Sequence, residues 1–262
     1  MRKQSGANVL VLLAHNDDEY FVALRIGEEV RLGSRVWVAY LTHGSIYGAD
    51  SKVRIEESAR ALRGLGASHS DMLTIGYQAD IFDLKLHERM ADAYEGLCAA
   101  LDTIRIERLY VPAWEGGHPD HDAAHLIGVA FARERNLAER LYEFPAYNRF
   151  HVMKFIDDAG TTLATSPDRL RAMKVFFSAW NYKTQRRTFL GLLPASLVRL
   201  LWSARQSYRP APADRDYSKP PHAGELFYEK RFGLSFDQFI AHAKSFYPSP
   251  SCGGMRESAQ KS

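Results

Sequence analysis

Two short polar clusters, about a hundred residues apart, contain the residue types that bind divalent metal ions. Together they supply three histidines and three aspartates: His15, Asp17, Asp18, His118, Asp120 and His121. Imidazole nitrogen combined with carboxylate oxygen suits zinc when one coordination position is left for water. A metal held in this way makes its bound water a nucleophile and polarises a carbonyl group. The clusters therefore predict one divalent-metal site suited to hydrolysis.

Both clusters follow segments that we expect to be buried strands. Residues 9–13 are an unbroken apolar run, typical of a strand buried on both faces, and 108–112 is a second such segment. His15 falls at the carboxyl end of the first strand, and a loop over 114–117 leads from the second to His118. Ligands bind at the carboxyl ends of strands in an open α/β sheet. The two clusters are thus predicted to meet at one edge of the sheet.

Each cluster also has a simpler explanation when it is taken alone. Asp17, Asp18 and Glu19 could be acidic residues that favour the start of a helix running to about Leu32. A single His-x-x-His spacing, as in His118 to His121, is a weak signal. Because both clusters stand at the ends of predicted buried strands, a shared metal site is the better explanation.

Strand and helix patterns alternate along the first part of the chain. We expect strands near 9–14, 35–42, 72–75, 108–112 and 140–147, and helices near 18–32, 52–65, 86–104 and 121–136. This order predicts an α/β fold, a Rossmann-like three-layer sandwich with a mostly parallel sheet. Neither a Gly-x-Gly-x-x-Gly sequence nor a Walker loop follows the first strand, which argues against a dinucleotide or nucleoside triphosphate.

The pattern changes after residue 150. We expect 1–150 to form the core, 151–247 to form a C-terminal α/β extension on the same domain, and 248–262 to be a disordered tail. Within the extension, 152–156 and 161–165 are predicted to form a hairpin, followed by a helix over 166–181. Four prolines in 205–221 predict a long exposed loop.

The segment 189–204 has apolar residues at helical spacing with arginines at both ends. It is too short and too interrupted to span a bilayer. One interpretation is a helix packed on the body of the protein or in a homo-oligomer interface. The other is a peripheral contact, in which the helix rests on a membrane surface or holds the lipid of a lipid-linked sugar.

The composition fits a globular enzyme. With 262 residues, of which 46% are hydrophobic, the chain can bury one sizeable core. A net charge of +3 without a long basic run argues against a nucleic-acid partner. Two cysteines do not indicate a disulfide framework, and 9–13 is too short for a signal-peptide core. We therefore expect a cytoplasmic protein, peripheral at the membrane if 189–204 docks there.

The sequence around these clusters resembles that of the PIG-L/LmbE-like zinc-dependent de-N-acetylases over about the first 150 residues. His15 to Glu19 is similar to the family's Ala-His-Pro-Asp-Asp-Glu motif, and Gly117 to His121 matches its second motif. Thr42-His43-Gly44 resembles a Thr-Asp/Asn-Gly turn of the family, and 54–57 resembles its Arg-x-x-Glu helix.

This resemblance implies a role for each motif residue. His15, Asp18 and His121 would be the zinc ligands, and Asp17 would be the general base. His118 would stabilise the oxyanion or protonate the departing amine. The implied reaction removes an acetyl group from the nitrogen of an N-acetylated amino sugar, its glycoside or a lipid-linked conjugate.

Two positions depart from the family pattern. Asn16 stands where the family has proline, so the backbone loses a fixed φ and gains a side chain that can hydrogen-bond locally. His43 replaces an acidic or amide residue, which indicates altered specificity. His43, Arg54, Glu115 and His125 are the candidate substrate contacts, and His125 is also a candidate fourth ligand.

Two other functions use the same residues. Two histidines and a carboxylate also bind Fe²⁺ in non-haem iron oxygenases, although those enzymes usually have β-barrel folds. A non-catalytic member of the fold could keep the metal and bind sugar, since Asn16 and His43 depart from the motif.

Overall fold

The computed structural model describes residues 6–45, 50–68, 71–148, 151–157, 160–166 and 168–246. Its centre is a seven-stranded sheet in the order β3-β2-β1-β4-β5-β9-β8. The five strands from β3 to β5 are parallel, and β9 and β8 continue the sheet in antiparallel orientation. The strands are β1 Asn8–Leu13, β2 Arg35–Tyr40, β3 Met72–Leu73, β4 Arg108–Pro112, β5 Leu141–Phe144, β8 Leu163–Thr165 and β9 Gln206–Pro210. The expected mostly parallel α/β sheet is confirmed.

The apolar run of β1 is buried on both faces, as predicted. Leu10 and Leu12 point into one hydrophobic core, whereas Val9, Val11 and Leu13 point into the other. β1 pairs with β2 on one side and with β4 on the other, which places it at the centre of the sheet. The carboxyl ends of β1 and β4 therefore lie side by side.

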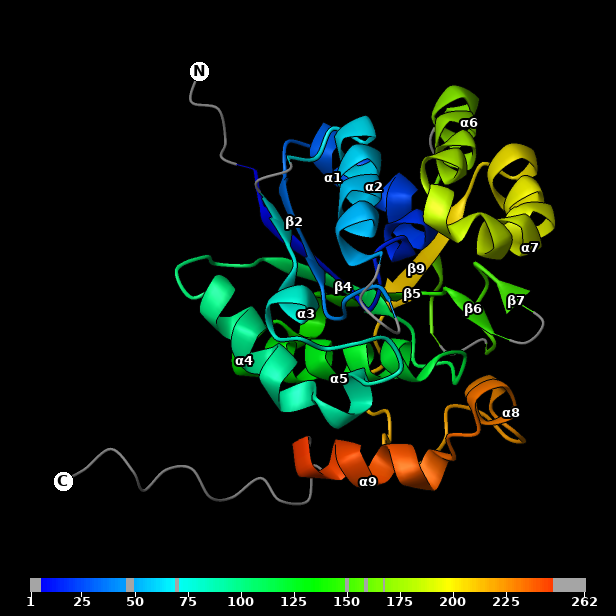
Figure 1. The fold of residues 1–262 in the computed structure, drawn as a ribbon. Coiled ribbons are helices and arrows are strands. Elements are labelled where there is room, and N and C mark those ends of the chain that lie inside the picture. The colour runs from blue at the N-terminus through cyan, green and yellow to red at the C-terminus, as the bar shows by residue number, and fades with distance from the viewer. Residues whose placement is uncertain are drawn as a thin grey trace.

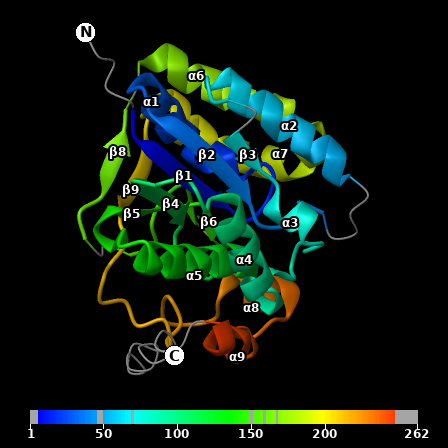
Figure 2. The ribbon, with the colours of Figure 1, turned by 90° about the vertical axis from the view of Figure 1, so that its left-hand side faces the viewer.

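Helices cover both faces of this sheet (Figure 1). The first core packs against α3 Ile75–Gln78, α4 Met90–Ala100, α5 Pro119–Glu134 and α9 Phe236–Phe246. The second packs against α1 Ala23–Arg31, α2 Ser51–Gly64, α6 Arg169–Ser178 and α7 Arg186–Ser196. Figure 2 shows α2 and α6 above the sheet and α5 and α9 below it. The molecule is thus a three-layer sandwich.

Several helix boundaries differ from the expected ones. The segment predicted as one helix over 18–32 begins with a 3₁₀ helix, Asp18–Val22, before α1. Gly33, with φ +84°, ends this region as expected. The helix predicted over 121–136 begins earlier, because His118 is the N-cap and Pro119 occupies the first turn.

The C-terminal part pairs differently from the prediction. The expected hairpin between 152–156 and 161–165 is wrong: β7 His151–Val152 pairs with β6 Tyr147–Asn148, and β8 pairs with β9. The segment 205–221, expected to be an exposed loop, contains β9. Arg209 of β9 is buried because its Nε donates a hydrogen bond to Glu143 Oε1 of β5 at 2.7 Å. An ion pair between distant segments thus places a charged residue inside a strand.

The remaining helices come from the C-terminal part of the chain. The helix expected over 166–181 is present as α6 and a 3₁₀ turn, with Asp168 as its N-cap. α7 continues into a π-helical turn, Leu197–Trp202, and α8 Phe227–Phe232 precedes α9. The predicted tail, 248–262, lies outside the described residues. Within the described part of the chain, no helix has the length and apolar character needed to cross a bilayer.

Candidate metal centre

The first polar cluster begins one residue after Ala14, at the carboxyl end of β1. His15 and Asp18 face each other across a tight turn, in which the backbone N–H of His15 donates to Asp18 Oδ2 at 2.7 Å. His15 Nδ1 lies 3.3 Å from the same oxygen. Both side chains are buried. The turn thus presents an imidazole and a carboxylate at one point.

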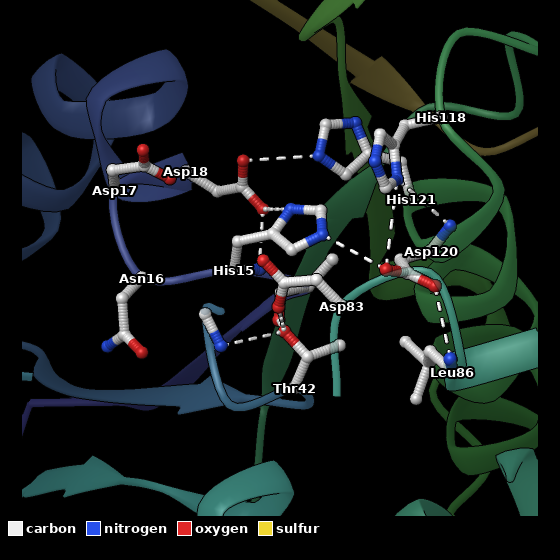
Figure 3. Close-up of polar contacts among 12 residues, drawn as sticks. His15, Asn16, Asp17, Asp18, Thr42, Asp83, Leu86, His118, Asp120 and His121 are labelled. Atoms are coloured by element: carbon white, nitrogen blue, oxygen red, sulfur yellow. Dashed lines mark hydrogen bonds and ion pairs between the residues drawn. The ribbon is translucent and has the colours of Figure 1, made fainter. Parts of the chain in front are cut away.

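The second cluster begins α5, directly after the loop that follows β4. His121 Nε2 lies 3.1 Å from Asp18 Oδ1, which joins the two clusters. His118 is the N-cap of α5, and its Nδ1 accepts the backbone N–H of Asp120 at 3.2 Å. Figure 3 shows Asp18 between His15 and His121, with Asn16 directing its amide away from the histidine rings.

In the described part of the chain, two groups of side chains could hold a metal ion: His15, Asp18 and His121, or His15, His118 and Asp120. In each group the ligand atoms lie within 4.8 Å of one another. Asp120 is already held by other donors, since Oδ2 accepts the N–H of Leu84 at 2.6 Å and Oδ1 accepts that of Leu86 at 3.1 Å. Asp120 Oδ2 also lies 3.1 Å from His15 Nε2.

This arrangement favours the first group. A carboxylate that binds one ring nitrogen of a histidine fixes the tautomer and leaves the other nitrogen free to bind a metal. Asp120 holds Nε2 of His15, so Nδ1 faces Asp18 with its lone pair. Two neutral imidazoles and one carboxylate fit a divalent ion such as zinc, with a position left for water.

The electrostatics of the cluster favour cations at Asp18. Burial raises the pKa of Asp18, but the neighbouring His121 and His15 outweigh burial and hold it well below its usual range. Burial lowers the pKa of His118 well below its ordinary value, and the nearby His15 lowers it further. His118 is therefore neutral, with Nδ1 accepting a hydrogen bond and the proton on Nε2.

Asp17 occupies an unusual backbone conformation next to these groups. Its φ of 112° and ψ of −19° lie in the left-handed region. Arg54 Nη2 lies 3.3 Å from Asp17 Oδ1 and donates to the carbonyl oxygen of Asn16 at 2.6 Å. Burial raises the pKa of Asp17 to about 8, although Arg54 opposes this shift.

A cavity of about 660 Å³ opens over the cluster. His15, Asp17, Asp18 and His118 lie in its wall, as does Arg54. Much of the remaining wall comes from the C-terminal half and includes Tyr147, Asn148, Val152, Arg187, Thr188, Phe189, Leu192, Phe227, Arg231 and Phe232. Another depression, of about 710 Å³, is lined by 102–106 and 135–140, which precede β4 and β5 at the opposite edge of the sheet.

The model of one protein family, PIG-L: GlcNAc-PI de-N-acetylase, matches residues 10–132, which contain both clusters. Residues 10–132 of the chain belong to the PIG-L family. No curated protein sequence matches the chain.

Solved structures share the PIG-L fold at low sequence identity. A deacetylase of the teicoplanin biosynthesis pathway is 16% identical with a TM-score of 0.62, over 80% of this chain and 100% of that one. A deacetylase of the A40926 pseudoaglycone is 19% identical with a TM-score of 0.60, over 79% and 97% of the two chains. The N,N'-diacetylchitobiose deacetylase from Pyrococcus horikoshii is 16% identical with a TM-score of 0.55, over 78% and 84%.

Three of the substrate-contact candidates, His43, Glu115 and His125, are not among the residues that line this cavity. His43 stacks on Phe82, and its ring nitrogens lie 3.0 Å from Ser51 Oγ and 3.0 Å from Asp80 Oδ1. Both nitrogens therefore already have protein partners.

Glu115 and His125 occupy buried positions near the N-terminal end of α5. Glu115 donates its backbone N–H to Asp122 Oδ1 at 3.2 Å, and burial raises the pKa of its own carboxyl well above its usual value. His125 Nδ1 lies 2.8 Å from the Pro112 carbonyl oxygen. His125 belongs to neither group of potential metal ligands. Of the four candidates, only Arg54 is in the cavity wall.

The structure also adds a residue for which the sequence predicts no role. Asp83 accepts the Thr42 hydroxyl at 2.7 Å, lies 3.6 Å from Arg54 Nη1 and is in the cavity wall. It stands in an irregular segment with no strand or helix pattern, so the sequence carried no signal for it. Asp120 was among the six candidates, but its contact with His15 depends on the fold.

Proposed function

We propose that the protein is a metal-dependent hydrolase that removes an acetyl group from the nitrogen of an amino sugar or its conjugate. The observation that carries this proposal is the group His15, Asp18 and His121 lying beside Asp17 and His118 at the base of an open cavity. The family description, GlcNAc-PI de-N-acetylase, supports the reaction class. The solved deacetylase structures support the assignment of the fold.

In this proposal His15, Asp18 and His121 hold the metal ion, and Asp120 orients His15. When bound, a divalent ion such as zinc lowers the pKa of a water and polarises the amide carbonyl. The ligand set also accepts Fe²⁺, so metal analysis must identify the ion.

The other two residues move protons and stabilise charge. Asp17 is ionised when a cation held at the neighbouring Asp18 offsets the rise in its pKa. The Asp17 carboxylate then takes a proton from the attacking water, whose oxygen bonds to the amide carbon, and delivers a proton to the nitrogen as the C–N bond breaks. Arg54 holds Asp17 in place. The Nε2–H of His118 donates to the developing oxyanion, an interaction of about 3 kcal/mol.

Metal content and acetate release test this proposal together. We expect the wild type to contain zinc and to release acetate from at least one member of a panel of N-acetylhexosamines, their glycosides and lipid-linked conjugates. Asp17→Asn should keep the metal and lose about 100- to 10,000-fold in rate, because only the proton carrier is removed. Asp50→Asn, the same change elsewhere in the cavity wall, is the matched control and should remain active.

Two further variants identify the ligand set. Asp18→Asn should abolish both metal binding and acetate release, whereas Asp120→Asn should weaken metal affinity only about 10- to 100-fold. The opposite order would assign the metal to the group containing Asp120. Bound zinc without acetate release from any substrate would favour a sugar-binding protein, and oxygen consumption with bound iron would favour an oxygenase.

A further inference from the structure

Exposed apolar side chains concentrate on α6, α7 and the π-helical turn that follows. Eight of the twelve large exposed hydrophobic side chains in the described part of the chain lie there: Leu170, Met173, Phe177, Trp180, Leu190, Leu197, Val198 and Trp202. Trp180 is 54% exposed and Trp202 is 86% exposed. We call this set the α6–α7 apolar face. An exposed apolar patch of this kind marks an interaction surface.

The face is a regular feature of the helices. Leu170, Met173, Phe177 and Trp180 recur at intervals of three and four residues, so they share one side of α6 and of the 3₁₀ turn, Ala179–Asn181, that continues it. The opposite side of α6, with Ala172, Val175, Phe176 and Ala179, is buried against the core. α6 thus presents apolar surface both inward and outward.

The exposed residues of α7 and its π-helical turn lie on the element next to α6. The two elements contact each other and lie side by side in Figure 1. Phe189, Ser196 and Leu200 face inward, and Leu190, Leu197 and Trp202 face solvent. The outward apolar residues of neighbouring helices therefore belong to one region of the surface.

The charge of this region has one sign. Residues 169–213 contain nine Lys and Arg residues and no Asp or Glu. Seven of the cationic residues are exposed: Arg169, Arg171, Lys174, Lys183, Arg186, Arg187 and Arg205. Of these seven, Arg171 forms an ion pair with Asp168, at the border of the region. Cationic side chains thus surround the α6–α7 apolar face.

The combination of an apolar surface with positive charge distinguishes between the possible binding partners of the α6–α7 apolar face. Two copies that met through the same face would bring like charges together, which opposes association. A bilayer with anionic lipids accepts both features, since apolar and tryptophan side chains enter the interface and cations bind the headgroups.

We propose that the α6–α7 apolar face docks the protein on an anionic lipid bilayer. Thr188, Gly191 and Leu192 of α7 also line the cavity, so docking brings the cavity next to the membrane surface. The contact involves none of the residues to which the hydrolysis is assigned. Membrane binding and deacetylation can therefore be tested separately.

Vesicle sedimentation of the full chain tests the apolar contribution. We expect binding to vesicles of phosphatidylcholine with phosphatidylglycerol, and much less to phosphatidylcholine alone. Leu197→Glu with Trp202→Glu should lower the partition coefficient by about tenfold or more, because two buried contacts become charged. Val53→Glu, at an exposed apolar residue on α2, is the matched control and should bind like the wild type.

Charge reversal tests the electrostatic contribution. Lys183→Glu with Arg186→Glu should lower binding to anionic vesicles by about 30-fold or more, because two cations near the headgroups become anions. Arg105→Glu with Arg140→Glu makes the same charge change at the opposite edge of the sheet and should leave binding unchanged. Added salt should weaken wild-type binding.

Light scattering and thermal unfolding complete the experiment. Every variant should unfold at a temperature close to that of the wild type, because the substituted side chains are exposed. If Leu197→Glu with Trp202→Glu and Lys183→Glu with Arg186→Glu both bind vesicles as strongly as the wild type, the proposal is overturned. A wild-type dimer that becomes monomeric in the variants, with no vesicle binding by either, would overturn it in favour of a second copy of the chain.

Discussion

At the scale of single residues, the backbone outlier of the metal centre is Asp17. The sequence predicts a loss of rigidity at Asn16, where the family has proline, but the left-handed φ of 112° belongs to the next residue. The conformation is held by the bond from Arg54 to the Asn16 carbonyl and by the Asp17 N–H, which donates to Glu19 Oε2 at 3.0 Å. A residue with a Cβ in such a conformation stores about 1–3 kcal/mol of strain.

Substitution of Asp17 by glycine or by alanine distinguishes the effect of backbone strain from the effect of losing the carboxylate. Asp17→Gly and Asp17→Ala remove the same carboxylate, and both should abolish acetate release. Because only alanine keeps the Cβ, the glycine variant should be more stable by about 1 kcal/mol, the reverse of the order expected in an ordinary segment. Urea unfolding of the two metal-free proteins measures the difference, and an equal or higher stability of Asp17→Ala would refute the strain.

At the scale of elements, the loop between β4 and α5 is fixed by close packing. A Cβ on Gly117 would lie 2.0 Å from the carbonyl oxygen of Tyr147, so only glycine fits against β6. On the other side, the Asp122 carboxylate accepts the backbone N–H groups of Glu115 and Gly116 at 3.2 Å. These contacts determine where His118 and the start of α5 lie.

Adding one methyl group to this loop should therefore disturb both stability and the site. Gly117→Ala is expected to lower the free energy of unfolding by about 2 kcal/mol, because backbone must move, and to reduce acetate release. Gly64→Ala is the control: nothing lies within 4 Å of its Cβ at the end of α2, so it should stabilise by up to about 1 kcal/mol. A Gly117→Ala variant with wild-type stability and activity would contradict this packing.

The elements also show which parts of the fold were predictable from sequence. The central strands β1, β2 and β4 were predicted because unbroken apolar runs identify strands that are buried on both faces. Both polar clusters were correctly placed at strand ends, and that position brings them together. β9 could not be predicted, because Arg209 becomes buried only through Glu143, which is 66 residues away in the sequence. The roles of Asp83 and Asp120 depend in the same way on contacts between segments.

At the scale of the whole molecule, one buried polar network joins the two halves of the chain. Glu143 of β5 accepts hydrogen bonds from Arg209 of β9 and from Arg215, whose Nη2 lies 2.9 Å from Oε1. His125 of α5 lies 3.7 Å from the same carboxylate and 2.9 Å from the Tyr217 hydroxyl. Arg209 Nη1 also contacts Asp157 Oδ1 at 2.5 Å. The network thus attaches the segment after β9 to the parallel core.

His125 should make this attachment sensitive to acid. Burial lowers the pKa of His125 to about 4, although Glu143 opposes this shift. The histidine of the unfolded state therefore binds a proton at a higher pH than His125 does in the folded state. The stability that depends on a neutral His125 is fully present above about pH 6.5 and is lost as the pH falls toward 4. The expected loss is about 3 kcal/mol.

The pH dependence of denaturant unfolding measures this effect. Between pH 7 and pH 4 the wild type should lose about 3 kcal/mol more stability than His125→Asn, whatever the stability of the variant at pH 7. His242→Asn, at an exposed histidine, controls for the loss of an imidazole. Equal losses in wild type and His125→Asn would contradict the prediction.

The cavity is built from two separate stretches of the chain. Every residue assigned to metal binding or proton transfer lies before residue 122, inside the segment that matches the family. Much of the opposite wall, in contrast, comes from Tyr147, Asn148 and Val152 and from 185–192 and 227–232. Substitutions in the later stretches can therefore change which molecule fits without altering the reaction. This separation gives evolution, and protein engineering, a way to exchange substrates while the chemistry is inherited intact.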